Sequence, residues 1–548
     1  MKRTVVWYRR DLRISDHEPL YRAARRGEVV PVFILDQSLL HHPETGSVRV
    51  AFMLDCLASL DADLQALGGR LILRKGDPVE VLIQLVYESE AEGIYAYLDY
   101  ERIYGRVRDA RLNHELKQKN IKIRWFEPTA GVDELVPYPR YRQFWFQEMA
   151  QGITPKPAFV RVPEHLQAER LPHVSDLLHE TPSISIPPGG TATARKLLKT
   201  FLDQKARRYF WQLSYPNAEV TSGLSPYIKF GVISIREVFQ AVRATPDEGD
   251  RRLRMSHQQL ISRLRWGSGF TQRFRYLPQL ELRSLYSVFD RDGWAFNEEL
   301  YQAWKLGQTG FPIVDAAARC LRATGGYLTL NFRSRAIYAS FLSNLIGMDW
   351  RFGALHFMRY LIDGDCPIDH YQWAMQAGVT HCIDKTWTRI YNPGQVAVDR
   401  CDPQGDFIKR WVPELSHLSP ELLGHPPQTA GYPAPILDYQ QARKHRGSQI
   451  ERQRQQLLQA SNILPFLARM PEDVTPFGAD RYGSEIGWVK TSTEGMFPAP
   501  LDLESLSPQE AQMLRTWFVA HVNVKPPKMM RRRPPKADSK VQQLSLLN

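Results

Sequence analysis

The sequence predicts an N-terminal doubly wound parallel α/β domain followed by an all-helical domain. Short apolar runs alternate with amphipathic helical segments over residues 1–130. The strand-like runs lack the period-2 alternation of half-exposed strands, which favours a parallel sheet covered on both faces. Beyond residue 191 the apolar residues recur almost wholly at helical spacing. Together these observations predict an α/β plus all-α fold class.

The first domain is expected to alternate strands and helices. Strands are predicted over residues 4–7, 29–35, 70–73, 93–98 and 121–126. Helices are predicted between them, over residues 18–26, 50–66, 78–88 and 107–119. No G-x-G-x-x-G turn follows the first strand, so the sequence does not support a dinucleotide at that position.

The rest of the chain is predicted to contain a connector, a helical domain, an extension and a tail. In residues 131–191 periodicity fades and prolines recur, which indicates an interdomain connector. The helical domain is expected over residues 192–480 and a C-terminal extension over residues 481–524. The main helices are predicted over residues 196–210, 234–243, 256–273, 297–305, 313–323, 335–346 and 350–361. Residues 525–548 are basic and contain several prolines, so this tail is predicted to be disordered.

The chain is basic, with 71 Lys and Arg against 59 Asp and Glu and a net charge of +12. Half of this net charge lies in residues 525–540, which hold seven basic residues and one acidic residue. Such a segment either keeps the protein soluble or captures nucleic acid electrostatically, and the sequence leaves both interpretations open.

Composition also excludes several classes of protein. The five cysteines are widely spaced and form no C-x-x-C pair, which disfavours disulfides, zinc ribbons and iron–sulfur clusters, so no metal site is expected. No apolar run approaches the roughly 20 residues of a membrane span. The first residues place charges where a signal peptide needs an apolar core, so we expect a cytoplasmic protein.

A candidate phosphate-binding loop occupies residues 221–231, with the sequence TSGLSPYIKFG. Thr221, Ser222 and Ser225 bring three hydroxyls together beside a glycine, and Pro226 suits the first turn of a helix. Hydroxyls and free backbone N–H groups at a helix start suit a phosphate oxygen. The alternative is an ordinary N-cap with no ligand.

Four ionisable residues lie in segments that are otherwise apolar enough to form a core: Arg333, Arg335, Asp363 and Asp365. Buried charges need partners. A helix carrying R-x-R that faces an acidic D-x-D would provide them, and it could line a pocket for a polar heterocycle. The alternative is a purely structural ion pair.

Seven motifs, in order from residue 4 to about residue 415, resemble the photolyase/cryptochrome family of blue-light flavoproteins: VVWYRRDLRISDHEPL, TSGLSPYIKFG, QAWKLGQTGFPIVDAAARCL, DWRFG, LIDGD, RIYNP and DPQGDFIKRWVPEL. The resemblance implies a photolyase-type antenna α/β domain over residues 1–130. It also implies that the helical domain binds FAD in a folded-back conformation.

The resemblance assigns cofactor-binding residues. Tyr209 resembles a flavin-contacting tyrosine. Arg335 and Asp363 resemble the buried ion pair beside the isoalloxazine, and Asp365 resembles a carboxylate near the ring edge. The positions that resemble the pyrophosphate loop are Thr221, Ser222, Leu224 and Ser225.

Asp369 falls where family members place an Asn or Asp opposite flavin N5. A carboxylic acid can supply a proton to a photoreduced flavin, whereas an amide cannot. An aspartate at this position resembles plant cryptochromes more than bacterial photolyases. The alternative is that Asp369, within CPIDH, only closes a turn.

The family also reduces its flavin through a chain of aromatic residues. Trp294 matches the distal position and Trp350 the middle one. The segment between LIDGD and YQWAM is about two residues shorter than in common members, which leaves Tyr371 or Trp373 as the innermost residue. Tyrosine is harder to oxidise and must lose a proton, so a tyrosine would slow reduction. The alternative is that these aromatic side chains only fill the core.

The expected substrate contacts depart from those of DNA-repairing members. Gln259, Ser262 and Ala336 stand where such members supply a Trp, an acidic residue and a Met, which argues against repair of cyclobutane dimers. Gly105 replaces the acidic residue of folate-binding members, so a folate antenna is not expected and the second chromophore stays unknown. The candidate walls or phosphate contacts are Arg263, Trp266, Trp373 and Arg389.

These residues support two main hypotheses about function. The first is a deoxyribodipyrimidine photolyase-like lyase, in which excited reduced FAD transfers an electron to a flipped pyrimidine photoproduct in DNA. The second is a cryptochrome-type photoreceptor without repair activity, which acts on a signalling protein. A third hypothesis, a binding module without cofactor, is disfavoured because the FAD-type residues are present. The sequence leaves the lesion, the partner and the oligomeric state open.

Overall fold

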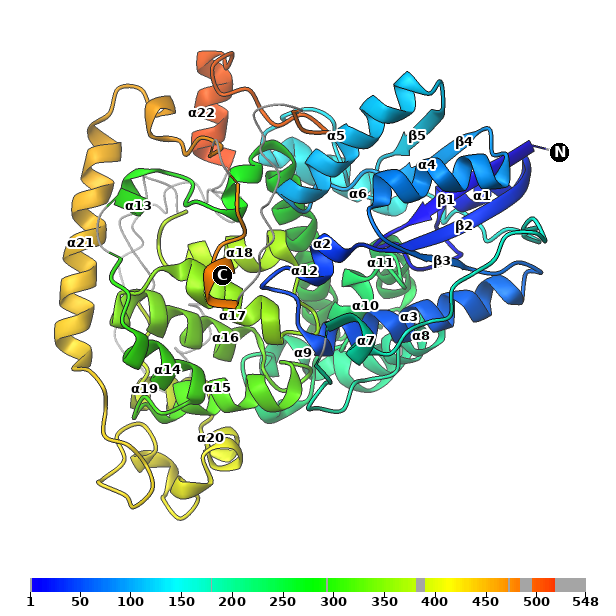
Figure 1. Cartoon of the computed structure of the whole chain (residues 1–548). Coiled ribbons are helices and arrows are strands. Elements are labelled where there is room, and N and C mark those ends of the chain that lie inside the picture. The colour runs from blue at the N-terminus through cyan, green and yellow to red at the C-terminus, as the bar shows by residue number, and fades with distance from the viewer. Residues whose placement is uncertain are drawn as a thin grey trace.

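The computed structural model describes residues 2–178, 180–291, 294–380, 390–471, 474–482 and 495–517 (Figure 1). It confirms the predicted class, an α/β domain followed by a helical domain. In Figure 1 the α/β domain forms one side of the molecule, and the long helix α21 (Tyr439–Gln459) runs along the opposite edge.

The α/β domain is built on a five-stranded sheet in the order β3-β2-β1-β4-β5, with every neighbouring pair parallel. Val5 and Trp7 of β1 belong to the core on one face of this sheet, whereas Val6 and Tyr8 belong to the core on the other. Both faces are therefore buried, which explains why the strands show no period-2 alternation. The strands are β1 (Lys2–Tyr8), β2 (Gly27–Leu35), β3 (Ile72–Lys75), β4 (Gly93–Tyr97) and β5 (Lys122–Phe126).

Helices cover the sheet, and the strand order reverses between β1 and β4. In open α/β sheets, ligands bind beyond the carboxyl ends of the strands at such a switch point. The helices of this domain are α1 (Glu18–Ala24), α2 (Gln37–Leu40), α3 (Ser47–Gln65), α4 (Pro78–Ser89) and α5 (Ile103–Gln118).

The segment expected to be a connector contains regular structure. It forms α6 (Tyr138–Ala150) and the short α7 (Val174–Leu178). Tyr141, Trp145 and Met149 of α6 are buried and lie four residues apart, which is a helical period that the sequence analysis overlooked. The Trp145 ring packs 5.5 Å from that of Phe239 in α11 (Ile235–Ala244), so this helix joins the two domains.

The helical domain surrounds its own apolar core. Its α-helices are α8 (Thr191–Thr200), α9 (Ala206–Gln212), α10 (Ser225–Lys229), α11, α12 (Arg251–Tyr276), α13 (Val288–Arg291), α14 (Glu298–Leu306), α15 (Pro312–Thr324), α16 (Phe332–Ser340), α17 (Trp350–Tyr360), α18 (Cys366–Gln376), α19 (Gln395–Cys401), α20 (Asp406–Trp411), α21 and α22 (Pro508–Trp517). Two π-helical segments, η1 (Phe201–Lys205) and η4 (Phe341–Ile346), extend α8 and α16. Short 3₁₀ turns are η2 (Pro216–Ala218), η3 (Pro278–Glu281), η5 (Pro413–Leu415), η6 (Pro420–Leu422), η7 (Leu464–Phe466) and η8 (Ala479–Tyr482).

Buried arginines hold the two domains together. Arg106 of α5 is fully buried and donates to the carbonyl oxygens of Phe274 at 2.9 Å and Arg275 at 2.8 Å, both in α12. Arg49 of α3 donates to the carbonyl oxygen of Leu361, just after α17, at 3.4 Å. Because each guanidinium donates to carbonyl groups across the interface, the α/β domain fixes the ends of helices that surround the site.

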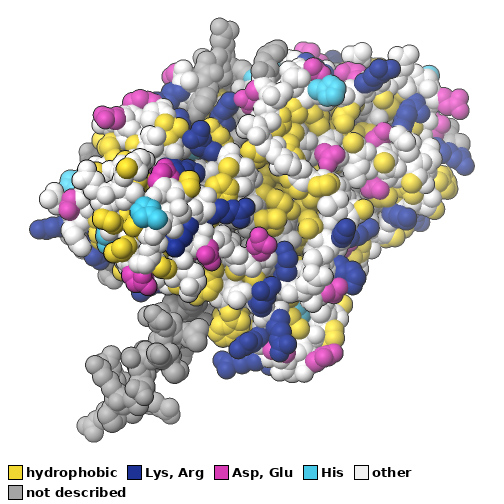
Figure 2. Space-filling model, turned by 90° about the horizontal axis from the view of Figure 1, so that it is seen from below, with side chains coloured by type: hydrophobic (Ala, Val, Ile, Leu, Met, Phe, Trp, Pro, Cys, Tyr) yellow, Lys and Arg dark blue, Asp and Glu magenta, His cyan; other side chains and the backbone are white. Residues whose placement is uncertain are grey.

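On the face shown in Figure 2, hydrophobic side chains gather near the middle and Lys and Arg side chains lie around them. Within the residues that the structure describes, no helix combines the length and the apolar character needed to span a membrane. The same residues contain no group of three or more His, Cys, Asp or Glu side chains placed to hold a metal ion.

Candidate functional site

A cavity of about 570 Å³ lies between the helical domain and the carboxyl ends of β1 and β4. This volume is within the range of about 300–1,000 Å³ that is typical of ligand pockets. Helices α12, α16 and α18 contribute its walls, and Arg9 and Asp99 reach it from the loops after β1 and β4. All of the predicted cofactor residues line it, together with Asp369: Tyr209, Thr221, Ser222, Leu224, Ser225, Arg335, Asp363 and Asp365.

The candidate phosphate-binding loop turns at Gly223, whose φ of +70° is a left-handed conformation that favours glycine. The hydroxyl of Ser222 accepts a hydrogen bond from the backbone N–H of Leu224 at 3.4 Å. Leu224 is the N-cap of α10 and makes no side-chain cap bond, so the ordinary N-cap predicted as the alternative is wrong. The buried Oγ1 of Thr221 has no hydrogen-bond partner. Because a buried hydroxyl normally has one, this atom indicates a ligand at the loop.

One of the two expected ion pairs forms. Arg335 and Asp363 make a two-pronged pair, with Nη1–Oδ1 at 3.2 Å and Nη2–Oδ2 at 3.3 Å. Arg335 also donates from Nε to the carbonyl oxygen of Leu330 and from Nη2 to that of Gly326, both at 3.0 Å. The guanidinium is thus fixed at the cavity wall by four bonds, and bidentate geometry is the strong form of such pairs.

The second pair of the R-x-R and D-x-D arrangement does not form. Asp365 instead lies 3.3 Å from Arg10 Nη1 and 3.4 Å from Lys229 Nζ. Arg333 donates to the hydroxyl of Tyr391 at 3.0 Å. The prediction failed because residues two apart on a helix point in nearly opposite directions, so Arg333 and Arg335 cannot face the same strip of carboxylates.

Helix α18, which the sequence analysis did not predict, supplies one continuous cavity wall. Asp365 caps it by accepting from the backbone N–H of Ile368 at 3.3 Å, and Pro367 lies in its first turn. An Asp N-cap followed by Pro is a helix start signal that could have revealed it. The residues facing the cavity follow the helical period: Asp365, Ile368, Asp369, Gln372, Trp373 and Gln376. Asp369 is part of this helix, so the alternative that it only closes a turn is wrong.

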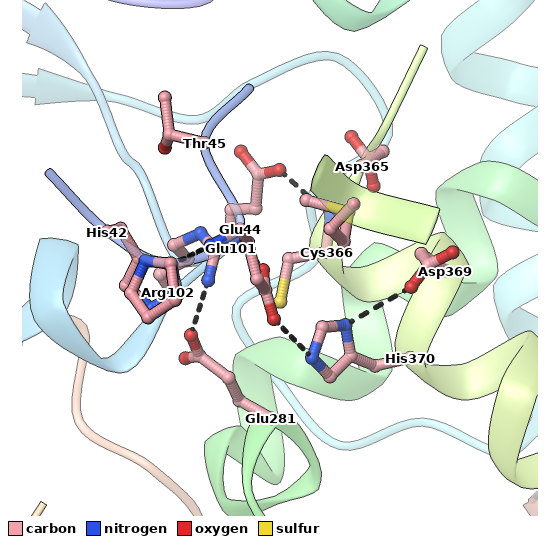
Figure 3. Close-up of polar contacts among 12 residues, drawn as sticks. His42, Glu44, Thr45, Glu101, Arg102, Glu281, Asp365, Cys366, Asp369 and His370 are labelled. Atoms are coloured by element: carbon pink, nitrogen blue, oxygen red, sulfur yellow. Dashed lines mark hydrogen bonds and ion pairs between the residues drawn. The ribbon is translucent and has the colours of Figure 1, made fainter. Parts of the chain in front are cut away.

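Asp369 lies in an environment that raises the pKa of its carboxyl. Burial raises the pKa of Asp369 well above its usual range, and the charges of Glu44 and Asp363 add to this, whereas His370 and Arg335 oppose it. Its buried Oδ2 makes no hydrogen bond; His370 Nδ1 lies 3.6 Å away (Figure 3). Its surroundings therefore favour the protonated form of Asp369 on the cavity wall.

The two candidates for the innermost aromatic residue, Tyr371 and Trp373, differ in their position relative to the cavity. Trp373 lines the cavity and is 2% exposed, so it lies inside the protein rather than at an exposed wall. Tyr371 is not among the described residues that line this cavity; its ring packs 4.8 Å from Phe270, with the guanidinium of Arg273 4.5 Å above it. Trp373 follows Asp369 by four residues and shares its helix face, whereas Tyr371 lies on another face.

Further aromatic rings continue outward from Trp373. The ring of Trp304 lies 6.1 Å from that of Trp373, and the ring of Tyr301 lies 6.0 Å from that of Trp304. The sequence analysis did not select Trp304 or Tyr301, although Trp304 belongs to a quoted family motif and is fully buried. The predicted middle residue, Trp350, is also fully buried, and its ring lies 6.0 Å from that of His370.

The predicted distal residue, Trp294, is half-buried. Its Nε1 donates to the carbonyl oxygen of Phe289 at 2.8 Å, and the guanidinium of Arg446 lies 4.3 Å above its ring. Neither Trp294 nor Trp350 lines the cavity.

Another wall of the cavity carries a stack of cationic and aromatic groups. The Arg263 guanidinium lies 4.6 Å from the Trp266 ring and 4.4 Å from the ring of Phe332, a residue that the sequence analysis did not select. All three line the cavity, as does Ala336. Gln259 and Ser262 are not among the described lining residues. Arg389 and the basic tail lie outside the described residues.

Gly353 of α17 allows Trp373 to pack closely, because a Cβ at this position would overlap ring atoms of Trp373. We therefore expect Gly353→Ala to destabilise the protein by about 1–3 kcal/mol, as is usual for an overpacked core. Urea unfolding would measure the change. The matched control is Gly447→Ala in α21, where a Cβ meets nothing within 4 Å. This control should stabilise the helix by about 0.5–1 kcal/mol, and equal effects at both sites would contradict the prediction.

An α/β domain joined to a helical domain around such a cavity defines a protein that binds an aromatic, phosphate-bearing cofactor. Comparison with known proteins makes this specific. Residues 4–145 match the family model described as DNA photolyase, and residues 260–452 match the model described as the FAD binding domain of DNA photolyase. The chain belongs to the photolyase/cryptochrome family, and its cofactor is FAD.

Individual relatives include both branches of this family. A deoxyribodipyrimidine photo-lyase of Synechococcus is 34% identical over 469 residues, which cover 79% of this chain and 93% of the relative. Cryptochrome-1 of Arabidopsis thaliana is 30% identical over 482 residues, covering 81% of this chain and 69% of the relative. The crystal structure of a class III photolyase from Agrobacterium tumefaciens superposes with a TM-score of 0.72 at 26% identity, covering 83% of this chain and 98% of that one.

The lining of the cavity fits FAD. Three of its buried polar atoms have no hydrogen-bond partner: Thr221 Oγ1, Asp369 Oδ2 and Trp373 Nε1. Buried polar atoms without partners are costly, so their presence in the lining of one cavity favours a polar ligand that satisfies them.

Proposed function

We propose that this protein is a blue-light-driven repair enzyme of the photolyase type, which acts on a pyrimidine photoproduct flipped out of DNA. FAD, when bound in its reduced form and excited by light, supplies the electron for this chemistry. The observation that carries the proposal is the stack of Arg263, Trp266 and Phe332 on a wall of the cavity lined by the FAD-type residues. A base extruded from DNA needs such an aromatic and cationic surface in place of its lost neighbours.

The other lining residues have separate proposed roles in binding the cofactor. The Thr221 hydroxyl and the loop after it are placed to bind phosphate oxygens, and Tyr209 closes the cavity beside them. The Arg335–Asp363 pair offers a fixed polar edge to the ring system. Asp369 can hold or release a proton on the same helix face as Trp373. In this proposal Trp373, Trp304 and Tyr301 form the aromatic path that returns electrons to the cavity.

Charge and surface character support DNA as the substrate. The net charge of +12 favours a polyanion, because each Lys or Arg that meets a phosphate releases counterions. The hydrophobic side chains bordered by Lys and Arg in Figure 2 suit a partner with both bases and phosphates. Several relatives of this chain are named deoxyribodipyrimidine photo-lyase, which further supports the proposal that its substrate is DNA.

A photoreceptor without repair activity is the second candidate, and Asp369 is the observation that favours it. A buried acid that lines the cavity can change its protonation when the cofactor is photoreduced. Such a change alters charge in the core of the molecule, which is what a light-driven signalling switch requires.

Repair of dimer-containing DNA distinguishes these functions. The purified yellow protein, reduced and illuminated with dimer-containing single- or double-stranded DNA, should restore the absorbance of the monomeric pyrimidines. Trp266→Ala should weaken transition-state stabilisation by about 1–3 kcal/mol, because stacking of one base on an aromatic side chain is worth about that much.

The control for this variant is Trp411→Ala. Arg410 lies 5.3 Å from the Trp411 ring, so this site is also an arginine–tryptophan stack, but it is outside the cavity. Repair should be unchanged in this control. A yellow protein that is photoreduced but repairs neither DNA form would reject the photolyase proposal and favour the photoreceptor. A colourless protein that takes up no FAD would reject both.

A further inference from the structure

A chain of buried polar side chains leads from the cavity to the α/β domain (Figure 3). Asp369 Oδ2 lies 3.6 Å from His370 Nδ1, and His370 Nε2 lies 3.1 Å from Glu44 Oε1. Glu44 forms an ion pair with Arg102, which also donates to Glu281 Oε1 at 2.8 Å. Asp369, His370, Glu44 and Glu281 are all less than 9% exposed. The chain therefore runs from the cavity wall of α18 to the loop between α2 and α3 without reaching solvent.

The charge on His370 follows from its neighbours. Burial opposes a charged ring, but the Glu44 carboxylate, whose Oε1 lies 3.1 Å from Nε2, raises the pKa of His370 above its usual range. Burial also raises the pKa of the Cys366 thiol to about 12, so this thiol is neutral and Glu44 is the anion that holds the imidazolium. Arg102 and His370 lower the pKa of Glu44 despite burial, so Glu44 remains ionised.

The other groups near His370 are His42, Glu281 and the Trp350 ring. Burial lowers the pKa of His42 to about 3, and Arg102 adds to this, so His42 is neutral. Burial raises the pKa of Glu281, and the Arg102 guanidinium opposes this shift. From α17, the Trp350 ring faces His370 at 6.0 Å and carries no charge.

A donor and an acceptor without partners face each other at the cavity end of this chain. His370 Nδ1 and Asp369 Oδ2 are both buried, and neither makes a hydrogen bond. Their separation of 3.6 Å is just longer than the 2.7–3.2 Å of an ordinary N–H···O bond. The contact is weak at this distance while Asp369 is a neutral acid, and it strengthens once Asp369 is a carboxylate, because an imidazolium then faces an anion.

We propose that His370 is a positioning residue that stores one proton for Asp369 and stabilises its carboxylate, with Glu44 holding the imidazole ring in place from the other domain. This inference rests on the proposed light-driven chemistry at the cavity. When Asp369 passes its proton to the photoreduced cofactor in the cavity, which is the base in this step, its O–H bond breaks, the electron pair stays on the carboxyl oxygen, and a carboxylate forms beside the imidazolium. The Nδ1–H bond of His370 then breaks, its electron pair stays on Nδ1, and the proton forms a new O–H bond on Asp369. The ring is left neutral, with its Nε2–H still directed at Glu44.

The first test measures the charge of His370 in the dark. Nitrogen NMR of the full-length flavoprotein with labelled histidine should show His370 as an imidazolium at pH 8, the signal being assigned by its loss in His370→Gln. Glu44→Gln should make His370 neutral at this pH, because it removes the anion that holds the charge. A neutral His370 in the unaltered protein would overturn the inference without involving any photochemistry.

The second test follows the Asp369 proton after a light flash. The infrared band of the protonated carboxyl, assigned by its loss in Asp369→Asn, should disappear and then return as the proton moves from His370. In His370→Gln the band should be present in the dark but return at least about tenfold more slowly, since a positioned proton donor contributes about 10²–10⁴ to such rates.

The matched control for this test is His356→Gln. His356 is a buried histidine of α17 whose pKa burial lowers well below its usual range, and it does not line the cavity. This variant should behave like the unaltered protein. Equal recovery in His370→Gln and His356→Gln would overturn the inference. A flavin that photoreduces with no loss of the Asp369 proton would instead overturn the role proposed for Asp369, and the dark measurement would still decide the charge of His370.

Discussion

Replacing Trp373 by phenylalanine should slow photoreduction of the bound flavin at least about a hundredfold, which corresponds to an increase of about 2.7 kcal/mol in the activation free energy. The physical reason is that Trp373 is the oxidisable aromatic side chain of α18 that lines the cavity, and phenylalanine keeps the packing but is far harder to oxidise. The measurement is the rate at which the absorbance of oxidised FAD bleaches under blue light with an external reductant.

Three further variants define the route of the electron. Trp304→Phe should also slow photoreduction, because its ring lies next to that of Trp373. Tyr371→Phe should have little effect, since Tyr371 packs against Phe270 and is not among the described residues that line the cavity. Trp350→Phe tests the middle position that the family resemblance implied. Strong loss in Tyr371→Phe or Trp350→Phe, with Trp373→Phe close to normal, would contradict the route through Trp373.

Replacing Arg335 by methionine should destabilise the protein by about 3 kcal/mol and cause it to lose FAD during gel filtration. Breaking a buried ion pair typically costs about 3–5 kcal/mol, and the lower end applies because the Arg335 side chain is 27% exposed, whereas that of Asp363 is only 10% exposed. The variant leaves the Asp363 carboxylate without its main partner and also removes the donors to two carbonyl groups. Urea unfolding would measure the free energy.

An exposed pair provides the comparison for Arg335. Lys199 and Asp203 form an ion pair on the surface of the helical domain, with side chains 79% and 51% exposed. Lys199→Met should therefore change stability by less than about 0.5 kcal/mol, the usual value for a solvent-screened pair. If Arg335→Met were as mild as Lys199→Met and retained FAD, the pair would have neither the structural nor the cofactor role given to it here.

Much of the fold could be predicted from local patterns. The strands of the first domain were recognised because both faces of the sheet are buried, which produces continuous apolar runs instead of alternation. Helix α6 was missed because its buried residues, Tyr141, Trp145 and Met149, alternate with polar residues and with further aromatic residues, Phe144 and Phe146, so that no clear apolar stripe appears. Helix α18 was missed because its sequence reads as a turn unless the Asp365 cap is noticed.

In the candidate site, too, local features could be predicted from the sequence and long-range contacts could not. The cofactor residues could be assigned because they lie in short motifs whose chemistry depends on neighbours along the chain, as in the loop that begins at Thr221. Partners distant in sequence could not be assigned in this manner. Asp365 was expected to pair with an arginine of α16, yet its partners are Arg10, from the loop after β1, and Lys229 of α10.

The sequence by itself determined the class of fold and the family, and it predicted which residues would meet at one cavity, because periodicity and motif spacing can be recognised without knowledge of the packing. Only the tertiary structure decided that Trp373 rather than Tyr371 faces the cavity, since this depends on the rotational phase of α18 against its neighbours. It also decided the direction in which the pKa values of Asp369 and His370 are shifted. These shifts depend on desolvation and on Glu44, which the fold brings from the other domain to within 3.1 Å of His370.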